Sequence, residues 1–133
     1  MADYEVPEDL FYHKEHEWVS KPDSDGMVTI GVTDFAQKSL TDVVYAGFKV
    51  DEGDEIEFEQ VVAEVESVKS VSDIYTPVAG EVIAINNELE DEPEKVNQEP
   101  YNAWFIKIKV KDFDADKTNL MDAAKYKEYC ASL

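Results

Sequence analysis

Cysteine is nearly absent from this chain, since Cys130 is the only one among 133 residues. A single cysteine cannot form an internal disulfide, and this usage is typical of a reducing compartment. No hydrophobic run approaches the ~18 residues that span a bilayer, so we expect no membrane role. Residues 1–15 are acidic and lack the apolar core of a secretory signal or the arginines of an organellar presequence. We therefore expect a cytoplasmic protein, or a protein of the mitochondrial matrix if a presequence has been removed.

Basic residues are also scarce. The chain has 12 Lys and Arg against 31 Asp and Glu, which gives a formal net charge of −19. Such a charge repels phosphate backbones and anionic lipids, so nucleic acid and membrane surfaces are not expected partners. It favours partners with basic docking surfaces, or it serves only to keep the protein soluble and monodisperse.

The composition is nevertheless that of a folded domain. Hydrophobic residues make up 44% of the chain and aromatic residues 11%, which argues against disorder. A chain of 133 residues can bury one core but not two. We predict a loose N-terminal lead-in over residues 1–10 and a single domain over residues 11–133, including a C-terminal helix.

Short strand-like segments separated by turn signals dominate the sequence. Val61, Ala63 and Val65 alternate with Val62, Glu64 and Glu66, which is the period of a half-buried strand. Many such segments predict a mostly β fold, a small sandwich or barrel of antiparallel strands. The expected strands lie within residues 11–20, 26–32, 43–48, 54–58, 60–67, 70–78, 80–86 and 103–110.

Two segments predict helices. Residues 33–42 carry Thr33 or Asp34 as a helix N-cap, and Phe35, Ala36 and Leu40 would form the buried face. Residues 119–133 are rich in helix formers, with Leu120, Ala124, Tyr126 and Lys127 at helical spacing. The acidic segment 86–100 predicts a loop with at most one helical turn after Pro93.

Lys69 stands apart from every other basic residue. Strand-like sequence lies on both sides of it, and no second basic residue occurs within ten positions in either direction. A lysine there neither packs a core nor builds a basic patch, so we expect it to be presented at the tip of a hairpin. The tip sequence Ser-Val-Lys-Ser contains no Asn-Gly or Gly pair, so turn chemistry alone would not place a hairpin there.

Five segments taken together resemble a known family. They are similar, in order and in register, to the lipoyl- and biotinyl-carrier domains, and within these to the H proteins of the glycine cleavage system. Biotin carriers typically place Met on each side of the lysine, where this chain has Val68 and Ser70. The matching segments are 13–18, 29–37, 65–82, 88–101 and 104–110.

The resemblance implies a barrel-sandwich of two small antiparallel sheets and lipoic acid attached covalently to Lys69. Acylation would remove the charge of the lysine and add a flexible arm that ends in a cyclic disulfide. The resemblance further implies a non-catalytic, monomeric carrier that takes the aminomethyl group of glycine from a pyridoxal-phosphate-dependent glycine decarboxylase to a tetrahydrofolate-dependent aminomethyltransferase. Electrons would pass to the flavoenzyme dihydrolipoamide dehydrogenase, and a lipoate-attaching enzyme would modify Lys69.

Other residues receive roles from the same resemblance. Glu17 and Asp73 are expected to line a cleft that holds the arm, where a carboxylate would bind the cationic amine of its cargo. Glu64 and Glu66 are expected on the outward face near the tip, where the attaching enzyme could read them, although both also fit ordinary solvated positions. Phe35 occupies a place where the family often has Tyr or His.

Three alternatives exist at the level of sequence, of which the first is disfavoured and the other two stay open. His13 and His16 on one strand would point to opposite faces, which argues against a metal site. The tip would look the same in a lipoate relay or in a lipoyl carrier of another pathway. An unmodified acidic binding module that merely keeps the fold is the third possibility.

Overall fold

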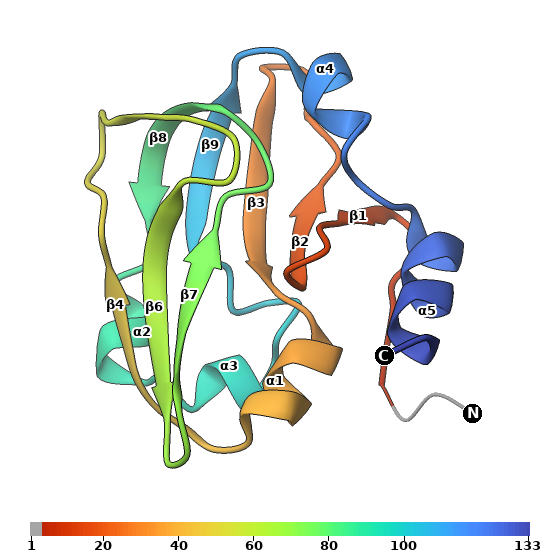
Figure 1. Cartoon of the computed structure of the whole chain (residues 1–133). Coiled ribbons are helices and arrows are strands. Elements are labelled where there is room, and N and C mark those ends of the chain that lie inside the picture. The colour runs from red at the N-terminus through yellow and green to blue at the C-terminus, as the bar shows by residue number, and fades with distance from the viewer. Residues whose placement is uncertain (1–3) are drawn as a thin grey trace.

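The computed structural model describes residues 4–133 and contains two antiparallel sheets. Both sheets and the hairpin that joins β6 to β7 are visible in Figure 1. The mostly β fold of two antiparallel sheets expected from the sequence is confirmed. One sheet has the order β1 (Leu10–Tyr12), β2 (Glu17–Ser20), β3 (Met27–Val32), β9 (Ile106–Val110), β8 (Gly80–Ile85) and β5 (Glu55–Ile56), and the other has β4 (Val43–Phe48), β6 (Val61–Ser67) and β7 (Val71–Tyr75).

The segment 11–20, expected as one strand, forms two. A tight turn separates β1 from β2: the His16 amide donates to the His13 carbonyl at 2.9 Å, and His16 has a φ of 74°. The expectation that the two histidines lie on one strand is therefore wrong, because the chain reverses between them. Within residues 4–133 no group of His, Cys, Asp and Glu side chains is arranged to bind a metal ion.

The main core lies between the two sheets. Its members include Val19, Ile30, Val65 and Ile108, each nearly inaccessible to solvent. The predicted alternation along β6 breaks at its start, because the pairing with β7 shifts register between Val61 and Ala63. A bulge of this kind turns two successive side chains toward the core, so Val62 and Ala63 are both buried.

Helix α1 (Asp34–Leu40) begins where the sequence predicted. The Thr33 hydroxyl caps it by accepting from the Ala36 amide at 3.1 Å. Leu40 is buried as expected, but Phe35 and Ala36 are only half-buried, and Asp34 takes a buried position instead. This arrangement leaves Phe35 and Ala36 available at the surface between α1 and the strands.

The described chain holds more helix than the sequence predicted. The segment after β8 forms α2 (Glu88–Asp91) and α3 (Lys95–Gln98). Each packs on the core through one fully buried residue, which is Leu89 in α2 and Val96 in α3. A further short helix, α4 (Phe113–Lys117), precedes α5 (Ala123–Ala131). The expected C-terminal helix is confirmed, although its buried side chains are Ala123, Tyr126 and Cys130. None of the helices in residues 4–133 is long and apolar enough to cross a bilayer.

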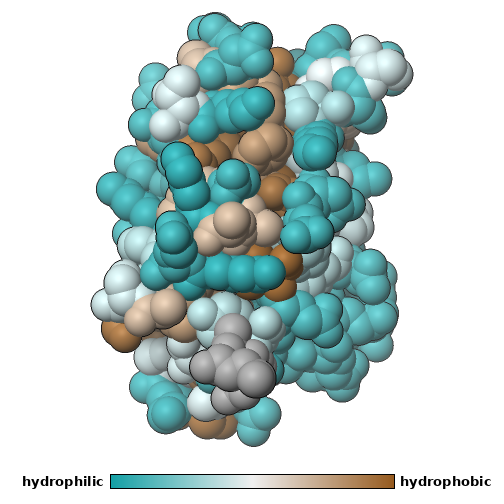
Figure 2. Space-filling view, turned by 90° about the vertical axis from the view of Figure 1, so that its right-hand side faces the viewer, coloured by the Kyte–Doolittle hydropathy of each residue, from teal (hydrophilic) through white to brown (hydrophobic). Residues whose placement is uncertain are grey.

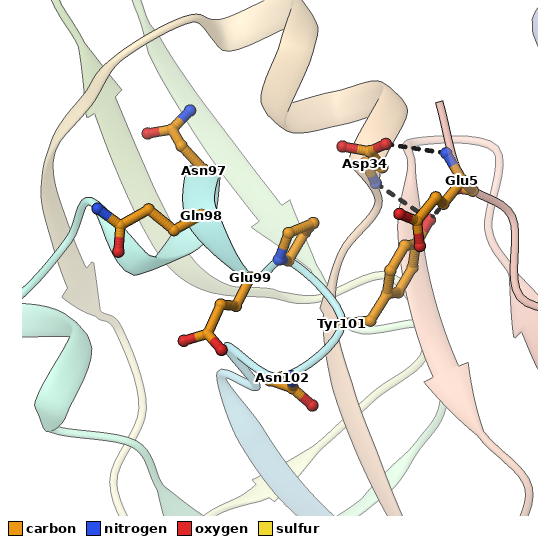
Figure 3. Close-up of a pocket in the computed structure, with 8 residues that line it drawn as sticks. Glu5, Asp34, Asn97, Gln98, Glu99, Tyr101 and Asn102 are labelled. Atoms are coloured by element: carbon orange, nitrogen blue, oxygen red, sulfur yellow. Dashed lines mark hydrogen bonds between the residues drawn. The ribbon is translucent and has the colours of Figure 1, made fainter. Parts of the chain in front are cut away.

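The predicted loose lead-in is wrong for residues 4–10, and residues 1–3 lie outside the described part. The Glu5 amide donates to an oxygen of Asp34 at 2.8 Å, and the Tyr101 hydroxyl donates to the Glu5 carbonyl at 2.6 Å. Figure 3 shows Glu5 meeting Asp34 and Tyr101 at the start of α1. Because Leu10 already belongs to β1, the segment is fixed at both ends.

Candidate functional site

Lys69 lies at the tip of the hairpin that joins β6 to β7. The two strands pair up to Glu66 and Val71, and residues 67–70 form the connecting turn. The Lys69 side chain is exposed, and no acidic side chain among residues 4–133 forms an ion pair with it. In Figure 1 this hairpin extends beyond the remaining strands. The predicted presentation of Lys69 at a hairpin tip is confirmed.

Ser67 supplies the turn chemistry that the tip sequence seemed to lack. Its amide donates to the Ser70 carbonyl at 2.8 Å. Its buried hydroxyl oxygen lies 3.2 Å from the amides of both Lys69 and Ser70, which makes it the acceptor for both. A serine that bonds to amides two and three residues ahead replaces the glycine of common two-residue hairpins. The base of the lysine is therefore fixed while its side chain is free.

Hydrophobic side chains surround the tip. Val68 and Val71 flank Lys69 with exposed fractions of 70% and 59%, and Val44 and Tyr45 of the neighbouring β4 are exposed to 55% and 44%. Exposed apolar groups gathered at one place are typical of a contact surface.

The two glutamates near the tip are half-buried on β6. Glu64 lies 3.6 Å from the Lys49 ammonium, and Glu66 stands opposite Tyr45 and Val71 in the sheet. Their predicted role in recognition by the attaching enzyme stays a prediction.

A cleft of about 400 Å³ runs between α1 and β7. We call it the arm cleft and define it by its lining residues. Asp73 is one of them and is exposed, so its predicted position in a cleft agrees with the geometry. The lining residues are Glu15, His16, Val32, Phe35, Ala36, Ser39, Leu40, Ser72, Asp73, Ile74 and Tyr75.

Glu17 lies behind the arm cleft and does not line it. Its side chain is only 1% exposed, and both carboxylate oxygens are bonded within the chain. One oxygen contacts His13 Nδ1 at 2.8 Å, and the other accepts from the Tyr75 amide at 2.9 Å. The expectation of a Glu17 carboxylate open to the cleft is therefore corrected, because a buried carboxylate needs these partners for itself.

His13 completes this arrangement. Its Nε2 lies 2.7 Å from an oxygen of Glu59, so the ring joins two carboxylates. Burial by itself lowers the pKa of His13, but the hydrogen bonds and charges of Glu17 and Glu59 outweigh it, and the pKa is raised above its ordinary value. Burial raises the pKa of Glu17, and the bonds from His13 and the Tyr75 amide oppose that rise.

His16 has a different environment on the wall of the arm cleft. Its Nδ1 lies 2.8 Å from the Tyr126 hydroxyl, which also contacts the Thr33 hydroxyl at 2.7 Å. The ring packs on Phe35 with 4.7 Å between ring centroids. Burial lowers the pKa of His16, so the ring is neutral near pH 7 and presents an uncharged wall.

A second, smaller cavity of about 270 Å³ lies beside the N-terminal segment. Figure 3 shows the carboxylates of Glu5, Asp34 and Glu99 around it together with the amides of Asn97 and Asn102. Asp34 and Tyr101 are already bonded to the backbone of Glu5, so this cavity fastens the segment to α1. Figure 2, which views the α5 side, shows hydrophilic residues over most of the surface and a narrow hydrophobic band between them.

Two residues of the site escaped the sequence analysis. His13 was considered only as a metal ligand, and Glu59 received no role. No local pattern announces them, since 46 residues separate the two partners along the chain. The left-handed φ of 66° at Glu59 is unusual for a residue with a side chain, but it becomes visible only in three dimensions.

The two antiparallel sheets, with a lysine exposed at a hairpin tip, define the class as a barrel-sandwich domain of the lipoyl-carrier type. The family profile described as "Glycine cleavage H-protein" matches residues 10–133. The chain therefore belongs to the glycine cleavage H-protein family.

Relatives match over nearly the whole chain. The probable glycine cleavage system H protein of Pyrococcus abyssi is 48% identical over 133 residues, covering 100% of this chain and 98% of that protein. The glycine cleavage system H protein of Marinobacter nauticus is 48% identical over 129 residues, with coverage of 96% and 97%. A crystal structure of a glycine cleavage system H protein from Mycobacterium marinum superposes with a TM-score of 0.82 at 28% identity, covering 95% of this chain and 99% of that one.

Proposed function

We propose that this protein is the lipoyl carrier of a glycine cleavage system and that Lys69 is its attachment site. The observation that carries the proposal is the exposed Lys69 side chain at the β6–β7 tip, in a chain that belongs to the H-protein family. In this role the protein has no catalytic group of its own. It positions an arm that partner enzymes act upon.

The residues around Lys69 fit a lipoyl group. An attaching enzyme needs an accessible amine on a rigid base, and Ser67 fixes the backbone of the tip. Val68 and Val71 offer apolar contacts to the hydrocarbon part of an arm. When attached, lipoate would supply a cyclic disulfide, one sulfur of which can take up the aminomethyl group of glycine while the other becomes a thiol; the dithiol left after the group is passed on would be reoxidised.

The arm cleft supplies what the tip does not, a partly enclosed surface. Phe35, Leu40 and Ile74 give it apolar walls, and Asp73 gives it a carboxylate. An amine is cationic near neutral pH, so the Asp73 carboxylate would bind it by a charge-assisted hydrogen bond. The cleft would also restrict water, to which an aminomethyl cargo is unstable.

Partners follow from the family and from the charge. We propose a pyridoxal-phosphate-dependent glycine decarboxylase, a tetrahydrofolate-dependent aminomethyltransferase, dihydrolipoamide dehydrogenase and a lipoate-attaching enzyme. A formal charge of −19 favours basic docking surfaces on each of them. Each partner must reach the same tip in turn, which is easiest for a monomer.

Intact mass and an activity assay test this function. Wild-type protein expressed with a lipoate-attaching enzyme should gain the mass of one lipoyl group, located on Lys69 by peptide mapping. Lys69→Arg keeps the charge and length of the side chain but cannot be acylated in this way, so it should gain no mass and support no glycine–bicarbonate exchange with the decarboxylase.

The exposed Lys111 offers a matched control, and Lys111→Arg should behave as the wild type. A biotinyl mass, or no added mass on the wild type, would contradict the lipoyl assignment. Lipoylated wild type that supports no exchange would instead favour a lipoate relay or a carrier of another pathway.

A further inference from the structure

A buried histidine joins three segments of the chain behind the arm cleft. His13 directly follows β1, Glu17 is the first residue of β2, and Glu59 belongs to the loop between β5 and β6. The ring of His13 lies 2.8 Å from Glu17 and 2.7 Å from Glu59, and its side chain is 1% exposed. These three side chains form what we call the Glu59–His13–Glu17 chain.

The short distances determine how many protons this chain holds. A nitrogen and an oxygen cannot approach to 2.7 or 2.8 Å without a proton between them. Two such contacts on one ring require two protons, so the ring is an imidazolium between two carboxylates, or one of the carboxyls is protonated. The Glu15 amide also donates toward Nδ1, at the longer distance of 3.3 Å, and this weaker contact is lost when Nδ1 carries a proton.

Glu17, at one end of the Glu59–His13–Glu17 chain, contacts the wall of the arm cleft. The second oxygen of Glu17 accepts from the Tyr75 amide at 2.9 Å, and Tyr75 lines the cleft together with Asp73 of the same strand. His13, the middle member of the chain, lies in the turn after β1, whose residues Glu15 and His16 line the cleft as well. The buried Glu17 carboxylate thus connects the two walls of the arm cleft, β7 and the β1–β2 turn.

Glu59, at one end of the Glu59–His13–Glu17 chain, has a strained backbone conformation. Glu59 has a φ of 66°, a region that residues with side chains seldom occupy. Its amide donates to the Thr76 carbonyl at 2.8 Å, immediately after β7. This conformation directs the Glu59 carboxylate to His13, and backbone strain of this kind is typical of functional sites.

We propose that His13 is a positioning residue of the carrier, which in its charged form holds the Glu59–His13–Glu17 chain together and thereby fixes β7 and the β1–β2 turn as the walls of the arm cleft. The effect of His13 on the arm rests on the proposed carrier function, whereas the contacts of His13 do not depend on it.

The chain has a defined response to pH. The charged groups that face it are Glu15 and Lys14 of the turn, the latter 3.8 Å from Glu59, with His16 nearby. Since the folded-state pKa of His13 is raised, its contribution is fully present below the ordinary pKa of histidine and is lost as the pH rises through the raised value. The cleft walls should therefore loosen on the alkaline side.

Glu59→Gln provides the test, because Glu59 is 37% exposed and can be changed without opening the core. The substitution removes one carboxylate partner of His13, so the pKa of His13, followed by NMR in the full unlipoylated chain, should fall. Hydrogen exchange of the Tyr75 amide reports the other end. In Glu59→Gln, the protection of this amide should be about tenfold lower than in the wild type at pH values between the His13 pKa values of the two proteins. Below both pKa values the two proteins should show equal protection.

Glu57→Gln is the matched control. Glu57 is exposed on the same loop, and its substitution removes the same charge. It should leave both readouts unchanged. A Tyr75 amide that loses the same protection at every pH would show a merely structural role and overturn the proposal. So would Glu59→Gln protein that matches Glu57→Gln in the pKa of His13 and in Tyr75 protection.

A last measurement connects the chain to the carrier. In glycine-loaded, lipoylated protein without transferase, ammonia release by Glu59→Gln should exceed that by Glu57→Gln only in the pH range where Tyr75 protection differs. Equal release at every pH would refute the positioning role. Wild type that gains no lipoyl group would refute the carrier function and its arm cleft, whatever the amide data show, whereas lipoylated wild type with unchanged amides in Glu59→Gln would refute only the role of His13.

Discussion

At the scale of single residues, backbone strain gathers around the arm cleft. His16, Thr41 and Glu59 have φ values of 74°, 63° and 66°, and no other non-glycine residue in the described part has a positive φ. His16 lines the cleft, Thr41 follows the lining residue Leu40, and Glu59 holds the chain behind it. Each such conformation costs roughly 1–3 kcal/mol and persists only where neighbouring bonds impose it.

Two replacements of Glu59 distinguish the cost of its backbone strain from the effect of losing its carboxylate. Glu59→Gly and Glu59→Ala both remove the carboxylate, but only glycine relieves a φ of 66°. Glu59→Gly should therefore be more stable than Glu59→Ala by about 1 kcal/mol in urea unfolding. The same pair at Glu57, whose φ is not positive, should give the opposite order, because glycine is more flexible when unfolded. Equal stabilities at position 59 would contradict the strain.

At the scale of elements, Thr33 joins three segments that are distant in sequence. Its buried hydroxyl caps α1 and contacts the hydroxyl of Tyr126 in α5, which in turn contacts His16 in the β1–β2 turn. The C-terminal helix is therefore attached to the start of α1 and to the wall of the arm cleft. Stacking of Tyr126 on Tyr12, with 4.5 Å between ring centroids, adds a second attachment.

Thr33→Val should destabilise the fold through the loss of this cap. Valine has the shape of threonine but leaves the Ala36 amide without its acceptor and removes a partner of Tyr126. We expect a decrease of about 1–2 kcal/mol in the free energy of unfolding, measured with urea. Thr118→Val, at an exposed hydroxyl after α4, should cost less than about 0.5 kcal/mol. A similar loss in both variants would show that the Thr33 cap is unimportant.

At the scale of the whole molecule, the surface is strongly acidic. With a formal charge of −19 on 133 residues, carboxylates repel one another in the folded state, and few ion pairs offset this. A charge of this size opposes self-association and favours partners with basic surfaces.

Screening should stabilise such a protein. Raising NaCl from about 0.01 to about 0.1 M shortens the Debye length from about 30 to about 10 Å. The midpoint of thermal unfolding should rise by about 4 °C, which corresponds to roughly 1 kcal/mol for a domain of this size. An equal osmolality of sucrose serves as the control over this low range. A midpoint that does not respond to salt would mean that the repulsion is negligible in the folded state.

Much of the fold and the exposed position of Lys69 could be predicted from sequence because the signals are local. The alternation along β6 and β9, the Thr33 cap and the isolated Lys69 are each readable within a few residues. The β1–β2 turn was missed because residues 13–16 contain no Gly or Pro. The helical turn predicted after Pro93 is α3, whereas α2 was missed because four residues are too few to show a period and a single buried residue, Leu89, holds it.

The buried part of the site could not be predicted for a different reason. Glu17 was expected to line the arm cleft from the family resemblance, but it is buried and paired, as carboxylates in an interior must be. Its pairing depends on His13 and on the Tyr75 amide, which lies 58 residues away in sequence. Contacts of that range leave no trace in local composition.

The N-terminal segment has a practical consequence for experiments. Tyr4 packs in the same aromatic cluster as Cys130, and Figure 1 shows both ends of the described chain on the α5 side, away from the β6–β7 tip. A tag or a solid support joined to either end would therefore emerge far from Lys69. Protein immobilised in this way should still present its lysine to every enzyme that visits it, which makes sequential capture of those enzymes from one column feasible.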